Sequence, residues 1–133
     1  MKIFRSHDPS PHPSSLQGQL PRIRAYGQFN LDPRSIDSSS FGTLEAELYP
    51  VATADPDGFT RALSQLVLPV GGLVVYGAAR LTGSLLGWRF NGAHYLAMLD
   101  AALEWRHQEG TTASHLAPYE LDRWHEVKGY NTW

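Results

Sequence analysis

The chain has 133 residues, a mass of 14.8 kDa, 42% hydrophobic residues and a formal net charge of −2. This size and apolar content are typical of one globular domain, residues 1–133, whose core needs no metal or disulfide to hold it together. The absence of cysteine excludes disulfides, Cys-ligated zinc, iron–sulfur clusters and a cysteine nucleophile, and the slightly acidic balance argues against nucleic acid as a partner.

The chain shows neither a secretory signal nor a membrane span. Residues 1–5 lack the apolar core of a signal sequence. The longest apolar stretch, residues 70–86, is interrupted by glycine and polar residues. We therefore expect a cytoplasmic protein that does not enter a membrane.

Residues 6–19 are rich in proline and serine. Such a segment offers few backbone donors and little apolar surface to bury, which predicts a loop or arm. His7 and His12 lie within it, but a metal site needs fixed ligand geometry that an arm does not supply.

Two segments near the N-terminus alternate between apolar and polar side chains, namely residues 22–29 and 43–49. A period of two is typical of a half-buried strand. We expect the two segments to pair as antiparallel strands. Residues 2–5 are a candidate third strand, because a two-stranded ribbon is only marginally stable alone.

A helix start is indicated at Asp55, Pro56 and Asp57. The first aspartate supplies an N-cap acceptor, the proline suits the first helical position, and the second carboxylate favours the positive end of the helix dipole. The predicted helix begins at Pro56, and Pro69 prevents its continuation.

Residues 73–86 carry mixed signals. Val74, Val75 and Tyr76 favour a strand, and two glycines penalise a helix. At the helical period, however, the apolar side chains of this segment share one face. We therefore predict a second helix, with Gly87 as its C-terminal cap.

Two more helices follow. Asn91 as a cap predicts a third helix that ends at residue 108 or 109, and Pro118 and Gly129 bracket a fourth. The complete prediction is an α+β fold, in which an N-terminal antiparallel sheet of two or three strands is followed by about four helices packed on it.

Carboxylates precede histidines by three residues in both C-terminal helices, as in some metal-binding bundles. The residues are Asp100, Glu104 and His107 in one helix, and Asp122 and His125 in the other. The first three lie opposite the apolar arc of their helix, so they should face solvent. Because the usual phosphate-binding glycine loops are also missing, we expect neither a metal nor another cofactor.

A small hydrolase would need a histidine base near a carboxylate. The candidate catalytic residues are His94, His125 and Glu120, and no spacing among them singles out a triad. Ser84 satisfies only part of the Gly-x-Ser-x-Gly nucleophile pattern.

Tryptophan and tyrosine are concentrated in the last third of the chain, beside several arginines. These three residue types dominate binding hot spots. Trp105 and Trp124 have the spacing of helix core residues. The candidate binding residues are those outside the predicted helices, namely Trp88, Arg89, Tyr130 and Trp133.

The segment GLVVYGAARL at residues 72–81, followed by Pro118-Tyr119-Glu120 and Trp124, resembles small uncharacterised bacterial proteins. The resemblance covers the C-terminal half only, and Ala117 stands where a serine or threonine cap would be expected. It implies a shared helical scaffold and assigns no catalytic residue.

Together these observations favour a small cytoplasmic protein-binding or regulatory module, including the inhibitor or immunity type. Its expected partner is another protein, or its own copy in a homodimer. Glu45 and Glu47 are acidic positions suited to a basic partner. The alternative is the small hydrolase described above.

Overall fold

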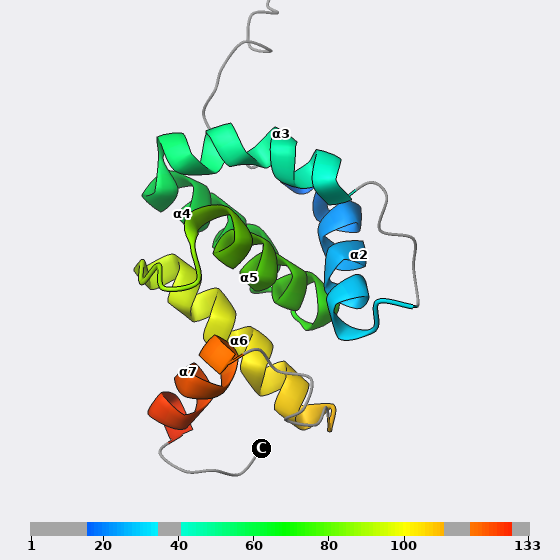
Figure 1. Cartoon of the computed structure of the whole chain (residues 1–133), viewed down its shortest axis with the longest axis vertical. Helices are drawn as coiled ribbons and strands as arrows, with labels where there is room; N and C mark the ends of the chain where they lie inside the picture. Colours follow the sequence, from blue (N-terminus) through cyan, green and yellow to red (C-terminus); the bar gives the residue numbers. More distant parts are fainter. Residues whose placement is uncertain (1–15, 35–40, 111–117, 129–133) are drawn as a thin grey trace, which may run out of the picture.

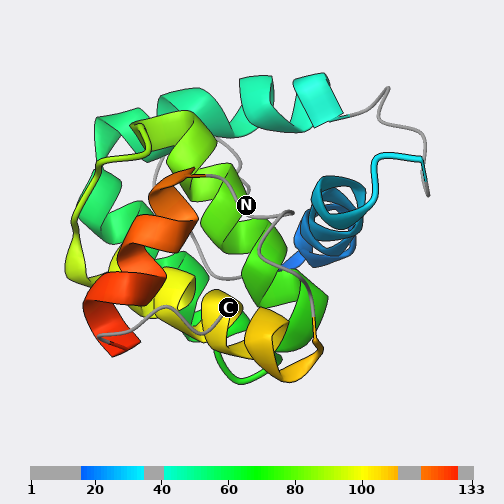
Figure 2. The same ribbon diagram turned by 60° about the horizontal axis from the view of Figure 1, so that its bottom comes forward.

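The computed structural model describes residues 16–34, 41–110 and 118–128, and every regular element within these ranges is a helix. α5 lies in the middle, packed against α2, α3, α4 and α6 (Figures 1 and 2). The predicted α+β fold is therefore wrong. The described helices are α2 (Leu20–Leu31), α3 (Phe41–Ala54), α4 (Pro56–Val67), α5 (Gly72–Leu86), α6 (Ala93–Gln108) and α7 (Pro118–Lys128).

Both main segments predicted as strands are helical. In α2 the buried positions Ile23, Tyr26 and Gly27 stand three and four residues apart, which is helical spacing. In α3 the buried residues recur every three or four positions, at Phe41, Leu44, Leu48 and Ala52. Over such short windows, a helical arrangement of apolar side chains also gives an apparent alternation of apolar and polar residues. The structure shows that the three- and four-residue spacing is the correct one. The proposed third strand, residues 2–5, lies outside the described residues.

The predicted starts and ends of α4 and α5 are confirmed. α4 begins at Pro56, and the Asp55 carboxylate caps it by accepting a hydrogen bond of 3.1 Å from the Gly58 amide. α5 ends at Leu86, where Gly87 adopts φ 98°, a left-handed conformation that favours glycine.

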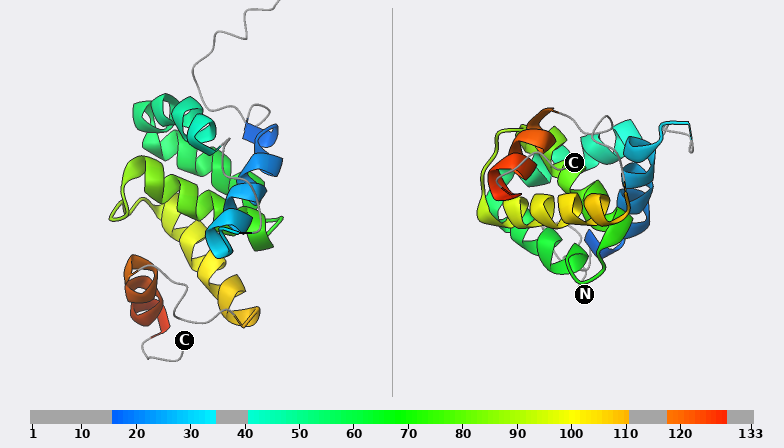
Figure 3. Two further views of the ribbon diagram at one scale, coloured as in Figure 1. Left: turned by 45° about the vertical axis from the view of Figure 1, so that its right-hand side comes forward. Right: turned by 90° about the horizontal axis from the view of Figure 1, so that it is seen from below.

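α6 and α7 also follow the prediction closely. α6 ends at Gln108 as expected, but its N-cap is Gly92 and not Asn91. α7 begins at the predicted Pro118, whereas Gly129 lies outside the described residues. α7 packs on α6 at the end of the molecule away from α3 (Figures 1 and 3).

One apolar cluster contains buried residues from α2, α3, α4, α5 and α6. Leu16, within the predicted arm of residues 6–19, is buried in this cluster, contrary to the expectation for an arm, while residues 6–15 lie outside the described part of the chain. Of the helices that the structure describes, none has the length and apolar character needed to cross a membrane.

The backbones of α2 and α5 touch at a pair of glycines. A Cβ atom on Gly77 would collide with the carbonyl oxygen of Ile23 and lie 2.9 Å from the Gly27 amide nitrogen. A Cβ atom on Gly27 would in turn collide with the carbonyl oxygen of Leu73. Only glycine at these two positions allows so close a helix crossing.

Candidate functional site

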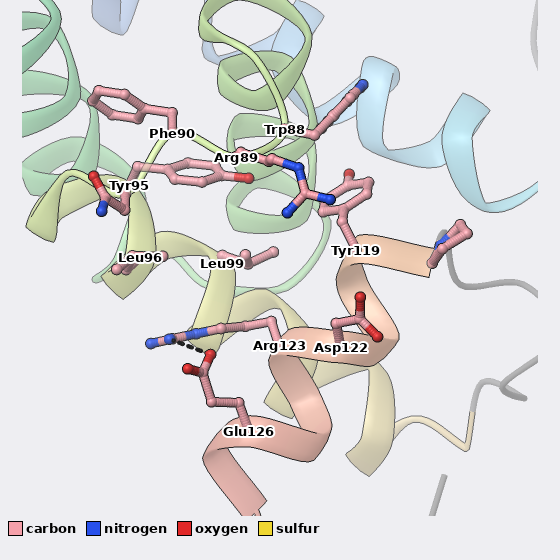
Figure 4. Close-up of a pocket in the computed structure, with 12 residues that line it drawn as sticks. Trp88, Arg89, Phe90, Tyr95, Leu96, Leu99, Tyr119, Asp122, Arg123 and Glu126 are labelled. Carbon is pink, nitrogen blue, oxygen red and sulfur yellow. Dashed lines mark hydrogen bonds and ion pairs between the residues drawn. The ribbon is translucent and has the colours of Figure 1, made fainter.

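A pocket of about 670 Å³ opens between α6, α7 and the loop that joins α5 to α6. Figure 4 shows side chains of α6 facing those of α7 across it. Phe90 and Leu96 contribute apolar surface, and charged groups come from α7 and from the loop. The residues that line the pocket are Trp88, Arg89, Phe90, Asn91, Tyr95, Leu96, Leu99, Pro118, Tyr119, Asp122, Arg123 and Glu126.

Trp88 and Arg89, both predicted as binding residues, lie together in the wall of this pocket. The Trp88 ring stacks on Tyr119 with 4.5 Å between ring centroids and 28° between ring planes. It nevertheless remains 42% exposed. Gly83 allows this position, because a Cβ atom there would collide with the Trp88 ring. The other predicted binding residues, Tyr130 and Trp133, lie outside the described residues.

Arg123 ties the middle of α7 to α6. Its Nε and Nη2 atoms each donate a 2.8 Å hydrogen bond to the Asp100 carboxylate, and Nη1 donates to Glu126 at 3.2 Å. Such two-bond arginine–carboxylate pairs are stronger than single contacts. The hydrogen bonds to Asp100 raise the pKa of Arg123 further above its ordinary value. Asp100, expected on a solvated face, is therefore part of the α6–α7 contact.

A second and buried anchor lies behind the pocket wall. Glu120, at the start of α7, has 0% of its surface exposed, and so does Arg106 of α6. Glu120 Oε1 accepts a hydrogen bond of 3.2 Å from Arg80 Nη1 and lies 3.5 Å from Arg106 Nη1. Arg106 Nη1 also donates to the Tyr76 hydroxyl at 3.0 Å, and Arg80 Nη2 donates to Asn30 at 3.1 Å. This buried cluster connects α2, α5, α6 and α7.

Among the described residues, the buried cluster opposes two guanidinium groups with one carboxylate. The face of the Tyr76 ring stabilises part of the excess charge, with Arg106 Cζ at 4.9 Å and Arg80 Cζ at 5.9 Å from the ring centroid. Within the described part of the chain, Arg80 Nε, Arg106 Nε and Arg106 Nη2 have no hydrogen-bond partner. In this part of the chain the cluster therefore opposes two positive charges with one negative charge and leaves three guanidinium nitrogens without an acceptor.

Tyrosine titration should report on this environment. Burial raises the pKa of Tyr76 and of Tyr95 from 10.0 to about 12, and the negative charge of Glu120 acts in the same direction. The stability that these neutral phenols contribute is complete below pH 10 and is lost as the pH rises through about 12, because the unfolded chain releases the protons first. Ultraviolet titration of folded and urea-unfolded protein should show this separation; coincident curves would contradict it.

The catalytic candidates do not meet in one arrangement. His94 Nδ1 lies 3.5 Å from the Ser64 hydroxyl, but Ser64 is buried and donates its proton to the carbonyl of Arg61 at 3.0 Å. The His94 contact then fits a ring N–H donating to the serine, the opposite of what a general base requires. Glu120 is held by arginines, and His125 lies in α7 with a side chain outside the described part.

The carboxylate and histidine motif of α6, Asp100, Glu104 and His107, does not form a metal site among the described residues. Asp100 pairs with Arg123, and His107 is exposed. Among the residues that the structure describes, no group of three or more histidine, aspartate and glutamate side chains lies close enough to hold a metal ion.

Two features were missed from the sequence, the burial of Arg106 and the burial of Glu120. The burial of Arg106 could have been inferred from its spacing. Arg106 lies on the same buried face of α6 as Leu99, Ala102 and Leu103. Comparison of the chain with protein-family models, curated proteins and solved structures gives no match.

Proposed function

We propose that this chain is a protein-binding module whose pocket between α6, α7 and the α5–α6 loop holds a segment of a partner protein. The observation that carries the proposal is the Trp88 ring, which is fixed against Tyr119 yet 42% exposed, with Arg89 beside it in the pocket wall. A rigid aromatic ring offers a large contact area at a small cost in conformational entropy, which is why Trp, Tyr and Arg dominate hot spots.

The pocket suits a partner segment with an apolar side chain. Phe90, Leu96 and Leu99 offer apolar surface for such a group, while Asp122 and Glu126 are exposed charges on α7. Its volume of about 670 Å³ is within the range of known ligand pockets, roughly 300–1,000 Å³. An apolar centre with a polar rim is the usual anatomy of a binding surface.

The acidic positions Glu45 and Glu47 support a basic partner less well than the sequence suggested. Glu45 accepts hydrogen bonds from Tyr26 and Ser84 at 2.7 and 3.1 Å, and Glu47 pairs with Arg22 at 3.0 Å. The pocket is therefore the stronger basis for binding. A regulatory protein, including one of the inhibitor or immunity type, acts by occupying its partner and needs only such a surface.

Substitution of Trp88 by alanine tests the proposal. Peptides selected from a displayed library on the immobilised wild-type protein should bind the Trp88→Ala variant with an affinity lower by about 2 kcal/mol, because truncating a central tryptophan removes the main anchor. Fluorescence polarisation of a labelled peptide measures this loss.

The matched control is Tyr49→Ala, which removes another exposed aromatic side chain, 56% exposed, from α3 on the far side of the molecule. Its peptide affinity should stay at the wild-type value, and circular dichroism should show that both variants fold. Equal peptide affinity of the two variants would refute the pocket as the binding surface. Light scattering of the wild-type protein tests the alternative that the partner is a second copy.

A further inference from the structure

The buried cluster behind the pocket contains an incompletely satisfied pair of arginines. Arg106 has 0% of its surface exposed, and two of its three guanidinium nitrogens find no partner among the described residues. Arg80 Nε is in the same condition. A buried donor without an acceptor is costly, and a buried charge is costlier. Glu120, the one described carboxylate in ion-pair contact with these arginines, contributes a single negative charge.

We propose that Arg80, Arg106 and the Tyr76 hydroxyl form a binding site for a phosphate-type oxyanion, and that the Glu120 carboxylate occupies this site from within the chain. Phosphate carries one to two negative charges near neutral pH and has more acceptor oxygens than a carboxylate. Arginine guanidinium groups match such oxyanions in charge and in hydrogen-bond geometry. A phosphoryl group therefore satisfies the two arginines more completely than Glu120 does.

The position of Glu120 makes exchange possible without unfolding the core. Glu120 belongs to the first turn of α7, and α7 packs on the outside of α6 (Figure 3). Its neighbour Tyr119 lines the pocket, and Arg80 Cζ lies 5.7 Å from the ring centroid of Trp88, another pocket residue. Movement of α7 away from α6 would withdraw Glu120 and open the arginines to the pocket. The external anion and Glu120 then compete for one site, whether or not the pocket binds a protein.

Titration with inorganic phosphate at constant ionic strength tests the competition. Glu120→Gln removes the charge of the internal occupant, so this variant should bind phosphate at least about tenfold more tightly than the wild-type protein in calorimetry. Acetate should bind the same variant more weakly than phosphate. The matched control is Glu45→Gln, which makes the same charge change on α3 and should leave phosphate affinity within about twofold of the wild-type value. Equal affinity of the Glu120→Gln and Glu45→Gln variants would overturn the proposal.

A second substitution locates the site. Adding Arg106→Gln to Glu120→Gln should abolish saturable phosphate binding, and unchanged binding would overturn the proposal. If Glu120→Gln does not fold, hydrogen exchange of the wild-type protein provides the test. Phosphate, compared with chloride at equal ionic strength, should speed amide exchange in α7 and slow it around Tyr76 and Arg80, whereas unchanged exchange in α7 would overturn the proposal.

Phenyl phosphate distinguishes two sources of the phosphoryl group. Tighter binding of phenyl phosphate than of inorganic phosphate supports a phosphoryl group on a larger molecule, whose ring contacts the pocket beside Trp88. Tighter binding of inorganic phosphate supports the free ion. Absence of saturable binding for both ligands in a folded Glu120→Gln variant would overturn the proposal.

Discussion

Replacing Gly77 by alanine is expected to lower the free energy of unfolding by about 3 kcal/mol, the upper range for overpacking. The added Cβ atom would overlap the carbonyl oxygen of Ile23 and approach the Gly27 amide nitrogen at 2.9 Å. Both obstacles are backbone atoms inside α2, so the overlap can be relieved only by moving one whole helix against the other. That movement would disturb the packing of α5, the central helix of the core.

Urea denaturation followed by circular dichroism measures this change. Gly42→Ala is the matched control, because Gly42 also lies in a helix but a Cβ atom there meets nothing within 4 Å. Alanine favours helix more than glycine does, so the control should gain about 0.5–1 kcal/mol. Similar stabilities of the two variants would show that α2 and α5 do not cross as closely as described.

Glu120→Gln is expected to cost about 3 kcal/mol of stability, because it leaves two buried or half-buried guanidinium groups without their described counter-charge. Arg106→Met should cost only about 1 kcal/mol, since Arg80 and Glu120 then remain as a balanced pair and the main loss is one hydrogen bond to Tyr76. Removing the charge of Glu120 should therefore lower the free energy of unfolding more than removing the charge of Arg106.

Urea denaturation of the two variants, followed by tryptophan fluorescence, measures the difference. Glu45→Gln serves again as a control for neutralising a glutamate, and its expected cost is at most about 1 kcal/mol. A larger cost for Arg106→Met than for Glu120→Gln would mean that the cluster does not carry the excess positive charge described above.

The helices from α4 onward could be predicted because their ends are marked by residues with specific backbone roles. Asp55 and Pro56 start α4, Gly87 ends α5, and Pro118 starts α7. The N-terminal helices are marked less fully, because α2 carries Pro21 in its first turn but none of the other end signals. α2 has no side-chain cap, and α3 contains Pro50 in its interior, so short alternation was the strongest local signal and it indicated strands.

The pocket was only partly predictable. Trp88 and Arg89 were identified because they follow the glycine that ends α5, where an aromatic ring is not committed to a helix core. Arg106 and Glu120 were missed because charged residues are rarely fully buried, and the partners that make burial tolerable come from three separate helices, α5, α6 and α7. Such a long-range arrangement leaves little trace in local sequence.

Amide hydrogen exchange of α7 tests most directly the claim that Glu120 holds this helix on α5 and α6. We expect exchange in α7 to quicken by about a hundredfold in Glu120→Gln, the equivalent of about 3 kcal/mol. Unchanged exchange in α7 would contradict this claim.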